Sequence, residues 1–236
     1  MLFAYFRKHI TYMRKYFHKF RSYWIEDFSF NTLLLILLNL LFVFPTLLEE
    51  NILPSQSILY VMLFLFFIGI WSSVKTTWIF IASFLFGAQV ILHLLVIQYP
   101  LHYSLHTIDK ISSVLNTLAF IYINIQCLFR DDKYNYYRIV GAINVYLLFA
   151  LLGAFLLDLI QHTFGSSIQG PVTLQGNTSD FISYIYFSLT SLTTVGFGDF
   201  LPANTATRSL SVFLSAVGML FPAVVIARLV SANSKK

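Results

Sequence analysis

The segment Leu192–Phe200, LTTVGFGDF, has the residue types and spacing best suited to bind an ion. Gly196 and Gly198 are separated by one residue, and glycine adopts positive φ without a steric penalty. An ordinary strand alternates its carbonyl groups between two sides, whereas regularly placed positive φ lets successive carbonyls face one side. Such a row of oxygens could replace the water around a cation. The sequence therefore predicts an ion-binding segment built from the main chain.

The residues around this segment predict the elements that hold it. Residues 180–192, DFISYIYFSLTSL, are expected to form a helix of about three turns, with Ser179 or Asp180 as its N-cap. Pro202 should interrupt the chain before a final apolar helix that begins near Thr207. Non-helical backbone at membrane depth is tolerated only where it is buried in protein or lines water. The predicted order is span, outer loop, short re-entrant helix, non-helical segment and span.

The composition places the chain in a membrane. Of its 236 residues, 58% are hydrophobic and only 11% are charged, far more apolar than a soluble globule of this size. A membrane-spanning helix needs about 20 mostly apolar residues, and the long gaps between charges supply six such segments. The polar gap between Asp158 and Asp180 is expected to be a loop. The six predicted spans have their centres at 31–48, 57–73, 77–98, 111–129, 139–161 and 208–229.

The distribution of basic residues predicts the topology. With both termini cytoplasmic, all of the fifteen Lys and Arg residues except Lys110 and Arg208 lie inside, as the positive-inside rule requires. The net charge of +5 is therefore not interpreted as a nucleic-acid surface. Residues 1–29 are predicted to form a basic, amphipathic helix at the cytoplasmic interface, where anionic lipids would attract it. Whether this helix only anchors the chain or also senses lipid is left open.

The sequence TTVGFGD, Thr193–Asp199, resembles the selectivity filter of the tetrameric potassium channels. The resemblance extends over 138–231, because GDFLPANTATRSLSV after the filter and ARLVS near the end of the last span look like the pore modules of small bacterial potassium channels. It implies an all-α membrane protein with six transmembrane helices per subunit, a re-entrant pore helix and a filter. It also implies a homotetramer in a bacterial inner membrane.

The same resemblance implies the roles of individual residues. Potassium ions would bind the carbonyls of the central filter residues and the Thr194 hydroxyl; Val195 would pack against the pore helix, and Asp199 would brace the outer mouth. Phe197 stands where tyrosine is commoner, and Thr190 stands where some relatives carry a buried acid. The implied ion-binding residues are Thr194, Val195, Gly196, Phe197 and Gly198, with Thr193, Asp199 and Thr190 as filter support.

The first four spans, within 30–130, are predicted to form a bundle that resembles a voltage sensor in topology only. The fourth span, 111–129, contains no Arg or Lys, and without gating charges the membrane potential can do little work on it. His93 has no carboxylate or second histidine at metal-ligand spacing on its helix, so we interpret it as a packed residue of the bundle.

The last span carries a possible hinge. Pro222 cannot donate to the carbonyl of Gly218 four residues earlier, which favours a bend there. Simple helix bending without a gating role explains the pair equally well.

Three functions remain open at this stage. We favour a potassium-selective channel over a nonselective cation channel or a nonconducting regulatory subunit of another channel. We find no paired carboxylates, metal-ligand spacing or nucleophile motif, and expect no enzyme activity. We also expect no cofactor, no nucleic acid and no soluble protein partner.

Overall fold

The computed structural model describes residues 29–50, 52, 76–98, 103–129, 136–172, 174 and 180–233. The described residues form helices and one pairing of two very short strands. Residues 1–28 and the span expected at 57–73 lie outside the described residues. The elements are α2 (Ser29–Leu38), a π-helical turn (Asn39–Val43), α3 (Phe44–Glu49), α5 (Thr76–Gln98), α6 (Tyr103–Leu128), α7 (Tyr136–Phe164), β1 (Ile168–Gln169), α8 (Phe181–Leu192), β2 (Leu201–Pro202) and α9 (Thr205–Asn233).

The structure supports three of the six expected spans. Among the described residues, Phe30–Leu48, Tyr137–Phe164 and Thr205–Arg228 are long and apolar enough to cross a membrane. They agree with the predictions at 31–48, 139–161 and 208–229. The chain is therefore a multi-pass membrane protein, with three spans supported where the sequence analysis expected six.

The helices α5 and α6 lie at the spans predicted at 77–98 and 111–129. Their described residues are not among the three segments that are long and apolar enough to cross a membrane. α6 covers nearly all of the predicted core at 111–129 and begins eight residues before it, at Tyr103. Asp109 and Lys110, which bound the apolar run in the sequence, lie within the helix and are paired with the neighbouring helices α5 and α7. Paired charges do not end a helix as an unpaired charge in lipid would.

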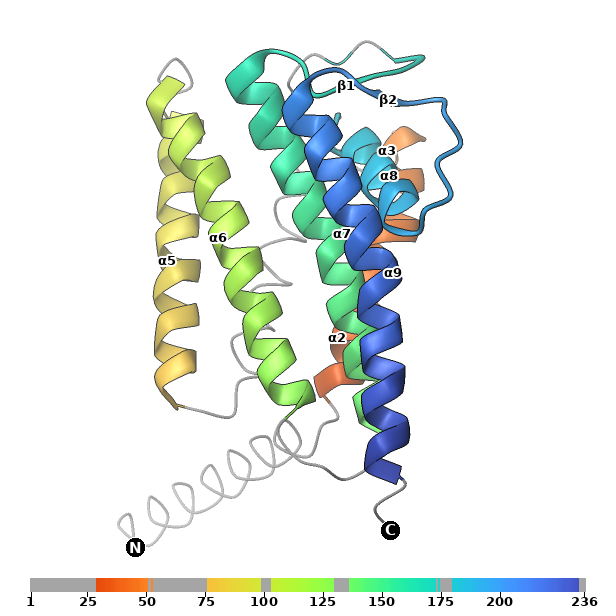
Figure 1. Cartoon of the computed structure of the whole chain (residues 1–236). Helices are drawn as coiled ribbons and strands as arrows, with labels where there is room; N and C mark the ends of the chain where they lie inside the picture. Colours follow the sequence, from red (N-terminus) through yellow and green to blue (C-terminus); the bar gives the residue numbers. More distant parts are fainter. Residues whose placement is uncertain are drawn as a thin grey trace, which may run out of the picture.

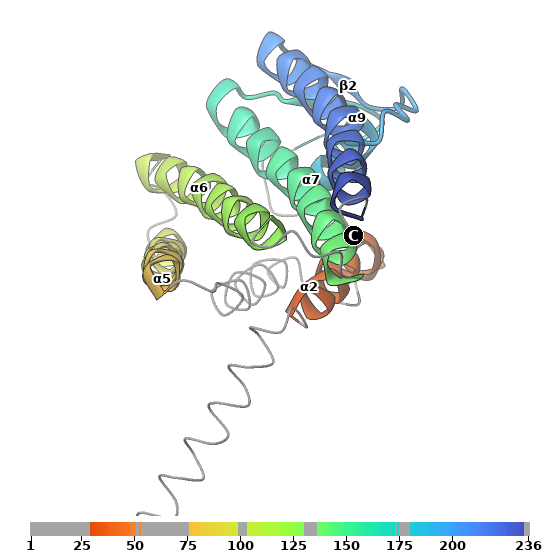
Figure 2. The ribbon, with the colours of Figure 1, turned by 60° about the horizontal axis from the view of Figure 1, so that its bottom comes forward.

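The helices stand side by side, as Figure 1 shows. α2, α5 and α7 run toward the end of the molecule that carries β1 and β2, here called the outer end, whereas α6 and α9 run away from it. Figure 2 shows α5, α6, α7 and α9 in that order, with α2 against α7. Thus α7 lies between the peripheral helices and the elements that carry the predicted filter.

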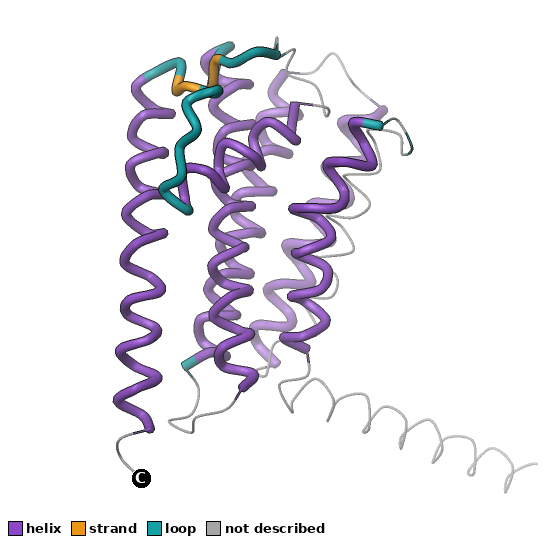
Figure 3. Tube along the Cα trace, turned by 90° about the vertical axis from the view of Figure 1, so that its right-hand side faces the viewer, coloured by secondary structure: helices purple, strands orange, loops and turns teal. Residues whose placement is uncertain are grey.

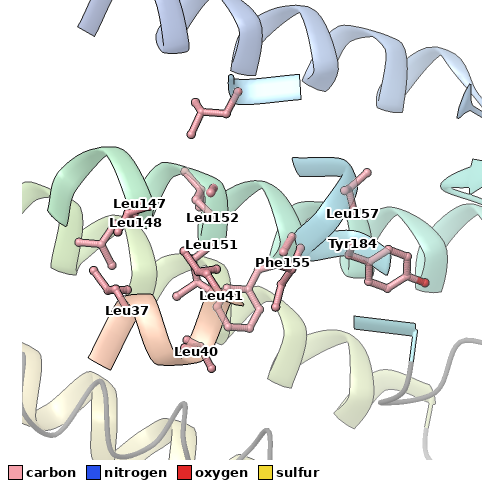
Figure 4. Packing of buried hydrophobic residues seen from close by; sticks show 14 of the residues in the cluster. Leu37, Leu40, Leu41, Leu147, Leu148, Leu151, Leu152, Phe155, Leu157 and Tyr184 are labelled. Atoms are coloured by element: carbon pink, nitrogen blue, oxygen red, sulfur yellow. The ribbon is translucent and has the colours of Figure 1, made fainter. Parts of the chain in front are cut away.

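The core forms where α2 and the π-helical turn pack on α7 (Figure 4). Leu37 lies beside Leu148 and Leu41 beside Leu151 (Figure 4), and all four are 3% exposed or less. Inside a membrane this contact is stabilised by close van der Waals packing rather than by removal from water. The packing fixes α7 as the support on which α8 rests.

The outer end is closed by a short antiparallel pairing of β1 with β2. Asn204 follows β2 and caps α9, because its Oδ1 accepts a hydrogen bond from the N–H of Thr207 at 2.9 Å. The Asn204 amide also donates to the carbonyl of Ser166. The chain therefore returns from the predicted filter to α9 through a segment that is bonded to the loop after α7. Pro222 lies inside α9, which continues as one helix through it.

Candidate ion-binding site

The helix α8 agrees closely with the predicted pore helix, and α7 holds it. Its Ser188 hydroxyl donates to the carbonyl of Ala150 at 2.6 Å, and a side chain larger than glycine at 153 would overlap Ser188. Asp180 occupies the N-cap position, one of the two that the sequence offered, without a side-chain cap hydrogen bond; Ser179 lies outside the described residues.

The segment that follows α8 folds back on the last turn of that helix. The carbonyl of Thr190 accepts hydrogen bonds from the N–H groups of Val195, at 3.0 Å, and Gly196, at 3.3 Å. The N–H of Thr194 donates to the carbonyl of Ser191 at 3.1 Å. The carbonyls that every helix leaves unpaired at its end are therefore occupied by the segment itself.

These bonds fix the direction of the carbonyl groups. The peptide bonds are trans, and in a trans peptide each N–H points opposite to the carbonyl of the preceding residue. The N–H groups of Thr194, Val195 and Gly196 point toward α8. The carbonyls of Thr193, Thr194 and Val195 must therefore point away from α8, toward the open side of the chain.

The backbone conformation alternates along the segment. Thr194, Gly196 and Gly198 have φ of +59°, +51° and +81°, whereas Val195 and Phe197 between them do not have positive φ. The sequence predicted positive φ at both glycines, and this is confirmed. Thr194 was not anticipated, because a β-branched residue pays a steric cost in that region. Its cost is offset by the hydrogen bonds to α8 on both sides of the turn.

The segment Thr193–Asp199 is exposed in the single chain (Figure 3). Phe197 is 72% exposed and Val195 is 54% exposed. Val195 was expected to pack against the pore helix, and within one chain it is not buried there. The reason is that α8 already engages this part of the segment through main-chain bonds, which leaves the Val195 side chain at the edge of the subunit.

Tyr186 on α8 holds the outer part of the segment. Its hydroxyl donates to Oδ2 of Asp199 at 2.7 Å, and this hydrogen bond raises the pKa of Tyr186. The ring also stacks on Phe197, with centroids 6.5 Å apart and planes 9° apart. Tyr186 was not predicted as a site residue; its signal in the sequence is an aromatic hydroxyl on the predicted helix, thirteen residues before Asp199.

Two flanking helices complete the contacts at the end of α8. The hydroxyl of Ser215 on α9 donates to the carbonyl of Ser191 at 2.9 Å. The hydroxyl of Tyr146 on α7 donates to the carbonyl of Leu192 at 3.3 Å. With these bonds the last turn of α8 is joined to both long helices beside it.

Gly218, predicted as part of a hinge, lies against the end of α8. A Cβ added at Gly218 would overlap the carbonyl of Leu192, so glycine is needed there for α9 to approach the end of α8. Replacing Gly218 by Ala would therefore test packing before it tested bending. Thr190 contributes through its carbonyl, while its hydroxyl donates to the carbonyl of Phe187 at 3.1 Å.

No group of three or more His, Cys, Asp or Glu side chains suited to a metal ion occurs in the part of the chain that the structure describes. His93, interpreted above as a packed bundle residue, lies with Nδ1 3.6 Å from Oδ2 of Asp109. The cation ligands available near Thr193–Asp199 are main-chain carbonyls and threonine hydroxyls.

Comparison with known proteins identifies one part of the chain. Residues 141–235 match the Ion_trans_2 family, which is described as "Ion channel". No curated protein and no solved structure matches the chain. The matched residues include most of α7, all of α8, the segment Thr193–Asp199 and α9, so this part of the chain is similar to an ion channel domain.

Proposed function

We propose that this chain is one subunit of a potassium-selective channel in which the segment Thr193–Asp199 is the filter. The premise is the ion channel domain at 141–235. The observation that supports the filter most strongly is the fold-back on α8, which turns consecutive carbonyls to the open side. Oxygens in this arrangement can take the place of the hydration shell of an ion. The resemblance of TTVGFGD to potassium channel filters supports potassium as that ion.

The ligands in this proposal come from a few residues. Potassium ions bind the carbonyls of Thr194, Val195, Gly196 and Phe197 and the Thr194 hydroxyl. Gly198 supplies the last positive φ, which lets the segment continue to the outer mouth. Thr190 and Asp199 support the segment, the first through its carbonyl and the second through Tyr186.

The proposed channel is a homotetramer, because one chain supplies only one side of an ion's coordination shell. Support comes from the surfaces that one chain leaves open. The filter segment is exposed, and only 17% of the apolar part of α9 is buried within the chain. Rotation about one axis would bring four such segments together and cover these surfaces.

We further propose that 138–231 is the pore domain and that 30–130 is a peripheral bundle without gating charges. α6, the described helix at the fourth predicted position, carries Lys110 as its single Lys or Arg residue, and that residue is paired with Asp158. A fixed ion pair contributes no movable charge to respond to voltage. The proposed location is a bacterial inner membrane with both termini cytoplasmic.

Potassium flux from liposomes that contain the purified protein tests the proposal. Wild-type protein should release potassium, and barium should block the release. Gly196→Ala should abolish flux, because alanine is strained at φ +51°. Gly87→Ala on α5 is the matched control, since nothing lies within 4 Å of the added Cβ. An absence of flux from assembled wild-type protein would refute the channel function and favour a regulatory subunit.

A further inference from the structure

The peripheral helices are joined to the pore domain by a short ion pair at the outer end. Nζ of Lys110 on α6 lies 2.6 Å from Oδ2 of Asp158 on α7, and both side chains are 19% exposed. A charge that is withdrawn from water to this extent is strongly disfavoured without its partner.

Further contacts between α6 and α7 surround the ion pair. The Tyr103 hydroxyl donates to the carbonyl of His162 at 3.2 Å, and the two rings stack with centroids 4.4 Å apart. Oγ1 of Thr107 lies 2.9 Å from Nε2 of His162. The contact therefore extends over two turns of α6 and fixes its height relative to α7.

Asp109, the neighbour of Lys110, faces the other way. Its Oδ1 accepts a hydrogen bond from the Gln89 amide on α5 at 2.9 Å, and its Oδ2 lies 3.6 Å from Nδ1 of His93. Two consecutive residues thus bind α6 to α5 on one side and to α7 on the other. The chain provides its own control, because only one of the two contacts leads toward the filter.

The outer turns of α7, which carry Asp158, pack against α8. Leu157, next to Asp158, lies beside Tyr184 of α8 (Figure 4), and both are fully buried. Phe155 contacts Phe181 at the start of α8, with ring centroids 5.2 Å apart. Burial, together with the charges of Asp158 and Asp180, raises the pKa of Tyr184, which agrees with a carboxylate close to the pore helix.

We propose that Asp158 is a positioning residue for the pore helix and that Lys110 holds it in place, so that the peripheral helices act on the filter from the outer end. The inference rests on the proposed channel function. It gives the peripheral bundle a role that does not require gating charges. When Lys110 is lost, the Asp158 carboxylate has no counter-ion and must be hydrated or pair with another group. We expect α7 to shift beneath the start of α8 as a result.

Substitutions at the two neighbouring positions separate this role from general stability. Lys110→Met and Asp158→Asn remove the ion pair, the double variant Lys110→Asp/Asp158→Lys restores it with reversed charges, and Asp109→Asn weakens only the contact with α5. The assembled proteins are compared by single-channel open probability in lipid bilayers and by amide hydrogen exchange of residues 181–192.

Both single variants should change the ratio of conducting to non-conducting channels by about 2- to 30-fold, the usual range for residues that couple distant sites. They should also speed exchange in residues 181–192, and the double variant should recover both properties. Asp109→Asn should change neither. Lys110→Arg, which keeps the charge, should behave as wild type and shows that folding tolerates replacement.

One outcome would overturn the positioning role, and a different one would overturn the channel function on which it rests. If wild-type protein conducts but the Lys110 and Asp158 variants match Asp109→Asn in both measurements, the outer ion pair does not position the pore helix. If wild-type protein does not conduct, the channel function fails. The exchange measurement then decides separately whether the ion pair still orders α8. Unchanged exchange in Lys110→Met would reject the positioning role without any current measurement.

Discussion

The helices α7 and α9 are both 29 residues long and contain candidate spans of the same mean hydropathy, yet the chain buries these spans very differently. In the membrane-spanning part of α7, 72% of residues are buried, against 17% in α9. Sequence composition cannot distinguish these two environments. The difference shows that one helix is supported by its own chain, whereas the other presents its surface to lipid, water or further copies.

The residues of the two helices illustrate the contrast. Leu148 and Leu151 of α7 are fully buried, whereas Met219 and Leu220 of α9 are 68% and 63% exposed. α9 is nevertheless tied to the end of α8 through Ser215. The supported helix therefore fixes the position of the filter, and the open helix is available to surround a pore.

The largest effect should come from shortening a buried side chain of α7. Leu151→Ala should lower the free energy of unfolding by about 2–5 kcal/mol, because it leaves a cavity between α7 and α2. Leu220→Ala on α9 should change it by less than about 0.5 kcal/mol in the isolated subunit. Denaturation in detergent measures both, and equal losses would remove the contrast between the helices.

The next largest effect is expected where α9 touches α8. Gly218→Ala should cost about 1–3 kcal/mol, because the new methyl group overlaps the Leu192 carbonyl and must push the helices apart. Potassium flux should fall with stability. Gly87→Ala on α5, where the added Cβ meets nothing within 4 Å, should be neutral or stabilising by up to about 1 kcal/mol. A fully active Gly218→Ala protein would contradict the close contact.

A smaller effect should follow from loss of the Tyr186 bond to Asp199. Tyr186→Phe keeps the ring that stacks on Phe197 but removes the donor, so the outer mouth should become less ordered and currents should decay faster during sustained opening. A raised pKa means that the bond is present below the usual tyrosine pKa of about 10 and is lost as pH rises through the higher value. Wild-type currents should therefore keep this contribution from pH 7 to about 9, and Tyr186→Phe should remove any alkaline loss that arises from it.

The smallest effect should be that of Phe197→Tyr. The ring is 72% exposed in the single chain, so the added hydroxyl meets no buried apolar group there. We expect unchanged selectivity and slower inactivation, because a hydroxyl can tie the filter to its surroundings. Timing the decay of current tests this, and identical kinetics would show that the missing hydroxyl has no consequence.

Much of the pore domain could be predicted from the sequence because its signals are local. The bounds of α8 follow from an apolar run that ends at two threonines, and positive φ at Gly196 and Gly198 follows from residue type. The extension of α6 beyond the predicted core at 111–129 could not be predicted, because the partners of Asp109 and Lys110 on α5 and α7 are distant in the chain.

The contacts that escaped prediction join residues far apart in the chain. Lys110 and Asp158 are separated by 48 positions, and no periodicity links them. Gly218 was interpreted from its proximity to Pro222, whereas its decisive neighbour is the Leu192 carbonyl. The positive φ of Thr194 depends on bonds to α8, which overcome the preference of the residue itself.

The reversal potential of single channels with potassium on one side of a bilayer and sodium on the other tests the central proposal most directly. A filter of inward carbonyls predicts a reversal potential close to the limit for potassium alone, together with its collapse toward zero in filter variants that still conduct. A wild-type reversal potential near zero would contradict potassium selectivity and identify a nonselective cation channel.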